Sequence, residues 1–387
     1  MSDYIPLSVP SISGNEWTYI KECLDTEWVS SAGKYVDAFE SEFARATGTQ
    51  HAIACVNGTA AIHVALQLAG VTPDSEVIAP TITFIAPINA IHYIGAHPVF
   101  MDADVYYNLS IEKTLNFLET ETRFMDGRTV NRSTGRRIAA VLPVHVFGNA
   151  VDMEPLVVAC RERNIAIVED ATESLGTRYS TGALGGRHAG TIGEIGCFSF
   201  NGNKLITTGG GGMIVTDDTQ FAEKARYLTT QAKDDPVRYV HHEVGYNYRL
   251  TNIQAAMGVA QLENLQRFLA AKRENFAFFR SHLEGVPGLS LAETPPYAQS
   301  NFWFYALQVN PVEYGMDIEQ LMRHLHENGI QSRPLWYPNH LQKQYRECQC
   351  YAIETALELH ANTLNIPCSV NLSAAHRERV VEALTSR

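Results

Sequence analysis

The sequence predicts an α/β protein with a large domain over residues 1–265 and a smaller C-terminal α+β domain over residues 266–387. In the first part, short apolar runs of strand length alternate with amphipathic patterns of helical period. Such alternation is typical of a mostly parallel sheet that helices cover on both faces. The Pro-rich segment 294–297 ends this alternation, and a mixture of strand-like and helical patterns follows it.

Five apolar runs of the large domain are expected to be strands, with helices between them. The strands are predicted at 51–56, 76–80, 98–101, 138–146 and 165–169, and the helices at 59–69, 85–93 and 153–163. The runs 196–200 and 213–216 are separated only by a glycine-rich turn, which leaves no room for a crossover helix. The polar stretch 119–137 is expected to be a surface excursion between elements.

The sequence after residue 250 predicts fewer strands and more helix than the sequence before it. A long helical pattern covers 251–282, and a strand-like run follows at 302–309. A helix is predicted at 318–328, and amphipathic helices are expected to close the chain.

The composition indicates a folded protein and disfavours several classes. Apolar residues make up 45% of the 387 residues, as in packed globular proteins. A formal charge of −12 disfavours nonspecific binding to nucleic acid or to an anionic membrane. No apolar run reaches the roughly 20 residues that span a bilayer. The start of the sequence lacks the basic and apolar regions of a signal peptide.

The cysteines predict reduced thiols. There are seven, an odd number, and most lie within apolar stretches. This usage favours a cytoplasmic protein over a disulfide framework. Cys348 and Cys350 form a C-x-C pair, but no second Cys/His pair lies nearby to complete a tetrahedral metal site. We therefore expect no metal.

A first candidate site follows the strand at 51–56. Gly58 and Thr59 stand at the start of the expected helix, where backbone N–H groups can bind an anion. Glycine at this place allows a ligand to approach the backbone closely. Thr59 could instead be the N-cap of the helix, and the motif alone does not decide between the two interpretations.

A second candidate site follows the strand at 165–169. Ligands of open α/β sheets bind at the C-terminal ends of the strands, where Asp170 stands. Its carboxylate could bind a metal, a ribose or a protonated ring nitrogen. Glu173, three residues further on, is expected within reach of the same crevice.

A third candidate is Lys204, which lies between two strand-like runs and precedes the glycines 209–212. A lysine in an apolar setting loses its charge more easily and can act as a nucleophile, although a buried lysine paired with a carboxylate gives the same pattern. The glycines match neither G-x-G-x-x-G nor the Walker loop, which disfavours a dehydrogenase. The other lysines are expected at the surface: Lys21, Lys34, Lys113, Lys224, Lys233, Lys272 and Lys343.

Together these features suggest pyridoxal 5′-phosphate (PLP). This cofactor requires a lysine, a carboxylate for its pyridinium nitrogen and an anion site for its phosphate. Phe84, in the loop after the strand at 76–80, is a candidate for stacking on the ring, although it could equally be a core residue.

Longer motifs resemble the sugar aminotransferases of the DegT/DnrJ/EryC1/StrS family over almost the whole chain. The resemblance implies the fold-type-I architecture of PLP-dependent transferases. Its landmarks are WVSSAG (28–33), NGTAA (57–61), TITFIA (81–86), PVHVFG (143–148), VEDA (168–171), FSFNGNK (198–204), GYNYRLTNIQAA (245–256) and SRP (332–334).

The resemblance also implies roles for single residues. Lys204 would carry the cofactor and move the proton, and Asp170 would pair with the pyridine nitrogen. Phe84 would stack on the ring, and Glu173 would lie beside its hydroxyl group. Phosphate contacts are implied for Gly58, Thr59 and Ser199, and for Asn247 toward a partner subunit with Arg249 close by, so a homodimer with shared active sites is expected.

Within the family, TGRRI (134–138), the four glycines and TTQAKDDP (229–236) look like aminotransferases of legionaminic-acid-type pathways, and less closely like perosamine synthases. This implies L-glutamate as donor and a UDP- or GDP-linked 2-acetamido-2,6-dideoxy-4-ketohexose as acceptor. The product would be a 4-amino sugar for a surface glycan. A GDP-perosamine or dTDP-4-amino-sugar synthase is the alternative. Candidates for sugar-nucleotide contacts are Trp28, Ser31, Arg249, Arg333 and His340.

Two positions depart from the family pattern. Glu173 stands where many relatives have Gln, and its carboxylate would repel a phenolate-like oxygen unless it is protonated or bridged. Gly210 stands where many relatives have Glu. Lys204 disfavours the dehydratases of the family, which have His there. An α-amino-acid aminotransferase and a ligand-sensing protein on the same fold are further alternatives.

Overall fold

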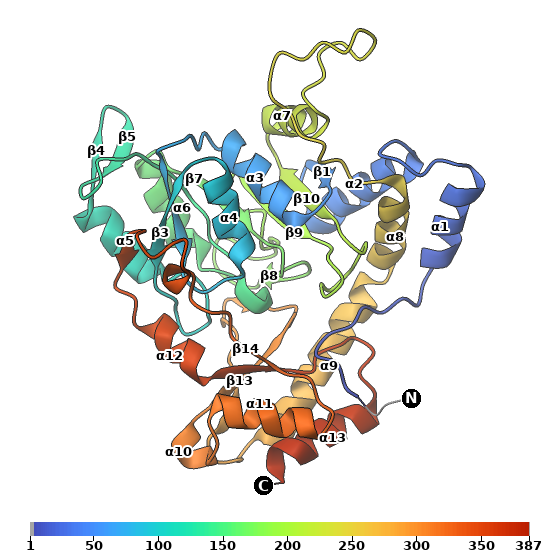
Figure 1. Cartoon of the computed structure of the whole chain (residues 1–387), viewed down its shortest axis with the longest axis vertical. Coiled ribbons are helices and arrows are strands. Elements are labelled where there is room, and N and C mark those ends of the chain that lie inside the picture. The colour runs from blue at the N-terminus through green and yellow to red at the C-terminus, as the bar shows by residue number, and fades with distance from the viewer. Residues whose placement is uncertain (1–3, 387) are drawn as a thin grey trace.

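The computed structural model describes residues 4–386, which form a larger and a smaller part connected by the long helix α9, Leu265–Leu283 (Figure 1). The larger part contains an eight-stranded sheet of order β1-β10-β9-β7-β6-β2-β3-β15, in which only β10 runs opposite to the other strands. The predicted fold class is thereby confirmed. The strands are β1 His51–Cys55, β2 Glu76–Pro80, β3 His97–Met101, β6 Ile138–Val141, β7 Ala166–Asp170, β9 Ile195–Ser199, β10 Gly212–Thr216 and β15 Cys350–Tyr351.

Helices bury both faces of this sheet. Successive strand residues point to opposite sides, so the apolar residues of each strand are divided between the two faces. Cys55 and Cys197 face one side, which α3, α4 and α7 cover. Ala54 and Phe198, their chain neighbours, face the other side toward α2 and α8, and α5 and α6 cover that side further along. The helices are α1 Glu16–Asp25, α2 Lys34–Thr47, α3 Gly58–Leu68, α4 Ile85–Tyr93, α5 Ile111–Thr120, α6 Met153–Glu162, α7 Thr219–Thr229 and α8 Asn252–Glu263.

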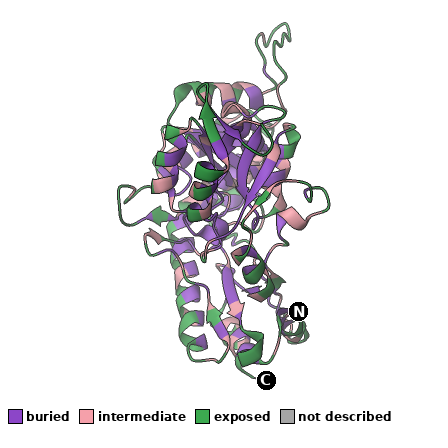
Figure 2. Cartoon of the chain, turned by 90° about the vertical axis from the view of Figure 1, so that its left-hand side faces the viewer, coloured by how far each residue is buried: buried purple, intermediate pink, exposed green. Residues whose placement is uncertain are grey.

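The smaller part is an antiparallel sheet with helices packed on it. Its strand order is β11-β13-β16-β14, and its core is separate from those of the large sheet. Figure 2 shows the strands buried in both parts and the outer faces of the helices exposed. The elements are β11 Leu289–Leu291, β13 Tyr305–Val309, β14 Arg333–Pro334, β16 Thr363–Ile366, α10 Pro311–Tyr314, α11 Ile318–Glu327, α12 Thr355–Asn362 and α13 Ala374–Thr385.

Two segments cross the division predicted after residue 265. Ile5 packs in the core of the smaller part and forms a parallel bridge with Ile330. In the other direction, β15 leaves the smaller part and pairs with β3 at the edge of the large sheet. The helix α9 serves both cores, since Phe268 packs in one and Phe279 in the other. The boundary at residue 265 stays a prediction.

Four predicted elements differ from the structure. The strand at 138–146 ends at Val141, and the chain then turns through the 3₁₀ segment η1, Val146–Gly148. The helix at 251–282 divides at Asn264, whose side-chain amide donates to the Ala260 carbonyl, 3.0 Å. The strand at 302–309 begins only at Tyr305, because Phe302 has a left-handed φ of 52°.

The fourth difference lies in the stretch 119–137, which contains the hairpin of β4, Thr122–Met125, and β5, Arg128–Asn131. The closing helices are also interrupted by β16, which the amphipathic pattern did not reveal. Short pairs and turns complete the chain: β8 Arg178–Tyr179 with β12 Ala298–Gln299, and the 3₁₀ segment η2, Asn339–Leu341. Within residues 4–386, no helix combines the length and apolar character that crossing a membrane requires.

Candidate active site

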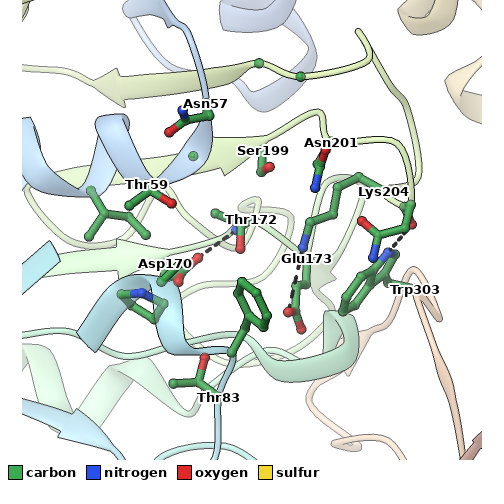
Figure 3. A pocket seen from close by; sticks show the side chains of 18 of the residues that line it. Asn57, Thr59, Thr83, Asp170, Thr172, Glu173, Ser199, Asn201, Lys204 and Trp303 are labelled. Atoms are coloured by element: carbon green, nitrogen blue, oxygen red, sulfur yellow. Dashed lines mark hydrogen bonds and ion pairs between the residues drawn. The ribbon is translucent and has the colours of Figure 1, made fainter. Parts of the chain in front are cut away.

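A cavity of about 290 Å³ lies between the two parts of the molecule, at the C-terminal ends of the parallel strands. Seven residues that the sequence singled out line it (Figure 3). They come from the ends of β7 and β9 and the segments that follow these strands, from the start of α3, and from the segment between β2 and α4. These residues are Gly58, Thr59, Phe84, Asp170, Glu173, Ser199 and Lys204.

The start of α3 forms one wall of the cavity. Asn57 is the N-cap of this helix, because its side-chain oxygen accepts the backbone N–H of Ala60 at 2.8 Å. Thr59 is therefore not the cap, and its position in the first turn is open to the cavity. A Cβ atom on Gly58 would lie 2.9 Å from the Cβ of Ser199. This wall thus combines a helix N-terminus, two hydroxyl groups and a glycine, as an anion site requires.

Asp170 ends β7 and is 2% exposed. Its Oδ1 accepts the backbone N–H of Thr172, 3.0 Å. Burial raises the pKa of this carboxyl group, while the bonds from Thr172 and the charge of Lys204 oppose the shift. A buried carboxylate of this kind is stabilised by a cation or an N–H donor in the cavity.

Lys204 reaches across the cavity to Glu173, with 3.7 Å between Nζ and Oε1 (Figure 3). The other carboxyl oxygen of Glu173 accepts the backbone N–H of Phe147 at 2.8 Å. Burial raises the pKa of Glu173 and lowers that of Lys204. Burial thus shifts both groups toward their neutral forms, which brings the proton affinities of the carboxyl group and the amine closer together.

Aromatic side chains form the wall that belongs to the smaller part. The Nζ of Lys204 lies 4.0 Å from the ring centroid of Trp303. Trp303 stacks on Phe304, with centroids 4.0 Å apart, and the ring centroid of Trp336 lies 6.4 Å from that of Trp303. Phe84 enters from the large part and is 55% exposed.

The sequence analysis missed this aromatic wall, and it also missed Thr83, Thr172 and Asn201, which line the cavity too. Trp303 carried a usable signal. It is one of only four tryptophans, and it stands at the start of the strand-like run 302–309. Trp336 had a weaker signal, because it lies next to the SRP landmark.

Several predicted contacts lie outside the cavity lining of this chain. Arg249 forms an ion pair with Glu40, with 2.9 Å between Nη1 and Oε1. His340 Nδ1 lies 2.6 Å from the hydroxyl of Thr81. The others are on the surface: Trp28, Ser31, Asn247 and Arg333 are exposed. The roles predicted for these six residues stay predictions.

Comparison with known proteins decides the family. Residues 10–385 match the DegT/DnrJ/EryC1/StrS aminotransferase family. The chain belongs to this family. It is 37% identical to GDP-perosamine synthase of Caulobacter vibrioides over 99% of both chains. It is 36% identical to a putative pyridoxal phosphate-dependent aminotransferase, EpsN, of Bacillus subtilis, over 99% of this chain and 96% of EpsN.

Solved structures with a similar fold also include aminotransferases. The crystal structure of the aminotransferase TlmJ from Streptoalloteichus hindustanus superposes with a TM-score of 0.87 at 25% identity, covering 99% of this chain and 98% of TlmJ. The protein is thus a PLP-dependent sugar aminotransferase of this family. The predicted family, enzyme class and cofactor are confirmed.

The donor set of the cavity fits PLP. The N-terminus of α3 with Thr59 and Ser199 offers donors for a phosphate, and Gly58 leaves room for it. Asp170 is a buried acceptor without an ion-pair partner among residues 4–386, as a protonated ring nitrogen requires. Lys204 supplies the amine, and its pKa is already lowered by burial.

Proposed function

We propose that this enzyme transfers an amino group from L-glutamate to C4 of a nucleotide-linked 4-keto-6-deoxyhexose. The observation that carries the proposal is the cavity in which Lys204 faces Glu173 beside Asp170, in a chain so similar to GDP-perosamine synthase over its full length. The product would be a 4-amino-4,6-dideoxy sugar nucleotide, and a surface glycan would be its destination.

Two acceptor sugars are supported by different observations. The motifs at 134–138 and 229–236 favour a UDP- or GDP-linked 2-acetamido-2,6-dideoxy-4-ketohexose of the legionaminic-acid type. The similarity to perosamine synthase favours a GDP-linked 4-keto-6-deoxyhexose with a free 2-hydroxyl group. The two acceptors differ at C2 and share C4, so the same transfer chemistry serves both.

The chemistry that PLP would supply, when bound, is that of a carrier for the amino group between the donor and the sugar. Asp170 would hold the ring nitrogen, and Thr59 and Ser199 with the N-terminus of α3 would hold the phosphate. Phe84 would cover one face of the ring.

Lys204 would carry out the proton transfers. Its amine, shifted toward the neutral form by burial, would take the proton from the α-carbon of glutamate and later deliver a proton to C4 of the sugar. Glu173, 3.7 Å away, would lie beside the ring hydroxyl in its protonated form, which removes the repulsion that its carboxylate would cause. The high pKa of Glu173 supports this role for a glutamate in place of Gln.

We test the function with purified enzyme, PLP, L-glutamate and a set of 4-keto sugar nucleotides. The set pairs UDP, GDP and dTDP with 2-acetamido and 2-hydroxy sugars, and mass spectrometry detects the amino sugar and 2-oxoglutarate. We expect the visible band of the lysine-bound cofactor to bleach with glutamate alone, and one acceptor to be aminated at C4. A protein whose cofactor band glutamate leaves unchanged, or amination at C3, would contradict the proposal.

We also propose that two chains form the active enzyme, in the cytoplasm. Asn247 is exposed and lies outside the cavity lining of its own chain, which suits a contact with the partner's cofactor phosphate. All seven cysteines are free in the structure, which suits a reducing compartment.

Mixing inactive variants tests the shared site. Lys204→Ala and Asn247→Ala are each expected to be inactive or severely impaired. If Asn247 serves the partner's site, a mixed dimer has one site without either change, so mixing should restore activity. If each chain serves its own site, the mixed dimer keeps one site damaged by each change, and activity stays low.

A further inference from the structure

Lys272 lies in α9 and is buried, with 3% exposure, although the sequence predicted it at the surface. Its Nζ donates to two backbone carbonyl groups, that of Trp303 at 2.6 Å and that of Cys368 at 2.5 Å. The ring centroid of Tyr305 lies 5.1 Å from the same nitrogen. Lys272 falls on the same helical stripe as the buried residues Phe268 and Phe279, which pack in the cores of the larger and the smaller part (α9 in Figure 1). The surface prediction followed the charge of the residue and overlooked this spacing.

No carboxylate forms an ion pair with Lys272 within the part of the chain that the structure describes. Burial lowers the pKa of this amine, and the Cys368 side chain beside it opposes the shift only in part. The two carbonyl groups could have bonded to water or to an uncharged donor. The role of this buried amine is therefore sought in the backbone segments that its two hydrogen bonds connect.

Lys272 holds a strained piece of backbone beside the active site. Phe302, directly before Trp303, has a φ of 52°, an unusual conformation for a bulky side chain. Strain of this kind persists only where the surroundings restrain the chain on several sides. The Trp303 N–H donates to the Phe147 carbonyl at 3.1 Å, and the Trp303 carbonyl accepts from Lys272.

The strained backbone places the Trp303 side chain over the catalytic amine. The indole N–H of Trp303 donates to the carbonyl of Asn203 at 2.7 Å, and the ring lies 4.0 Å from the Nζ of Lys204 (Figure 3). A ring face at this distance shields the amine from water and attracts its cationic form. The two lysines thus contact the same residue, Lys272 at the Trp303 carbonyl and Lys204 at the Trp303 ring.

We propose that Lys272 is a positioning residue of this enzyme, which holds the Phe302–Trp303 backbone so that the Trp303 indole covers the amine of Lys204. The proposal rests on the PLP chemistry of the family and does not depend on which sugar is the acceptor. It connects α9, the loop before β13 and the segment after β16 to the site through a single amine.

The test is Lys272→Met in the PLP-loaded enzyme, which keeps the length of the side chain and removes both hydrogen bonds. We expect the visible circular dichroism band of the bound cofactor to lose half or more of its amplitude. In a single turnover with glutamate, we expect the rate to fall roughly tenfold or more, since a misplacement of about 1 Å can cost up to 10²-fold. The dissociation constant of glutamate should stay within about twofold of wild type.

Lys113→Met is the matched control. Lys113 also donates to a backbone carbonyl, that of Ala352 at 2.7 Å, and it also connects distant segments, but it lies outside the cavity lining. Both variants are expected to unfold at a lower temperature, but only Lys272→Met should change the cofactor signal and the rate. An equal change in both variants would reduce Lys272 to a general stabilising residue and overturn the proposal.

Trp303→Phe keeps the proposal testable if Lys272→Met fails to fold. It removes the indole N–H that holds the ring at Asn203, so it should reproduce the loss of the circular dichroism band. A wild-type band in Trp303→Phe, or in a folded Lys272→Met, would overturn the proposal. If wild-type enzyme binds PLP but does not react with glutamate, the proposed donor fails, and the circular dichroism comparison still tests Lys272.

Discussion

The two walls of the active-site cavity are built in different ways. The wall of the large part consists mainly of short polar side chains at strand ends and at a helix N-terminus, with Thr59, Asp170 and Ser199 as examples. The wall of the smaller part consists of large aromatic side chains in loops, namely Trp303, Phe304 and Trp336. Lys204 lies between them, with a carboxyl group on one side and an indole ring on the other.

This difference indicates that the two walls bind different groups. The polar wall offers donors and acceptors for the charged groups of a cofactor, which strand ends and helix starts provide in every open α/β sheet. The aromatic wall offers apolar faces, which suit the carbon-bearing face of a 6-deoxy sugar and exclude water from the amine. Substitutions on the polar wall should therefore affect the chemistry, as should those at Trp303, which covers the amine of Lys204. Substitutions at Trp336, elsewhere on the aromatic wall, should affect the choice and binding of the acceptor.

Lys204→Ala should have the largest effect, because it removes the group that both walls surround. We expect the rate of amino transfer to fall by roughly 10²- to 10⁴-fold, the range for losing a positioned proton-transfer group. Steady-state assays with glutamate and the accepted sugar measure it. The control is Lys343→Ala, which removes a lysine outside the cavity lining and should leave the rate unchanged. A Lys204→Ala enzyme with more than about a tenth of wild-type rate would contradict the role of the amine.

Glu173→Gln should change the pH dependence of stability in the protein without cofactor. Burial raises the pKa of Glu173 to about 7 from its ordinary value of 4.5, so the folded state keeps a proton that the unfolded chain has released. Its contribution to the free energy of unfolding is therefore fully present below pH 4.5 and is lost as the pH rises to about 7. The loss amounts to at most about 3 kcal/mol.

The Gln variant cannot ionise and should not show this fall. Urea unfolding at pH 5 and pH 7 measures the difference between the two proteins. Glu119→Gln, at an exposed position of α5, is the control and should follow the wild type. Parallel behaviour of wild type and Glu173→Gln between these pH values would show that Glu173 is ionised in the folded protein.

Asp170→Asn should weaken the polar wall without removing its shape. Hydrogen bonds to a charged group contribute about 1.5–3 kcal/mol, so we expect a roughly 10- to 100-fold loss in the rate of the glutamate half-reaction. Stopped-flow absorption measures this step alone. Asp104→Asn is a suitable control, because that carboxyl group lies outside the cavity lining and also has a pKa raised by burial. Equal losses in the two variants would mean that Asp170 acts only through stability.

Trp336→Ala should have the smallest effect and test the aromatic wall. An aromatic contact adds about 0.5–1.5 kcal/mol beyond its buried area, so we expect the KM for the sugar nucleotide to rise roughly 2- to 10-fold. The kcat and the reaction with glutamate should change little. Trp17→Ala, 80% exposed on α1, is the control. If the change lowers kcat and leaves the KM for the sugar unaltered, the assignment of acceptor binding to Trp336 is wrong.

The polar wall was accessible to prediction and the aromatic wall was not. Asp170 directly follows an apolar run that predicts a buried strand, and parallel strands bring their ends to one edge. Ser199 was predicted from the family motif FSFNGNK, and it is the last residue of β9. Trp303 and Trp336 are separated by more than a strand and a helix, and they meet the cavity only because the smaller part packs against the large sheet. Trp28 and His340 were candidates because a sugar diphosphate needs donor groups, and both residues lie outside the cavity lining.

The sequence by itself determined the alternating strands and helices, the family, the cofactor and the residues at the strand ends. It could do so because these features depend on local periodicity and on motifs of consecutive residues. Tertiary structure decided that Lys272 is buried, that Arg249 pairs with Glu40, and which aromatic rings face Lys204. Those outcomes depend on contacts between segments that are distant in the chain, and the burial that these contacts produce lowers the pKa of Lys204 and Lys272.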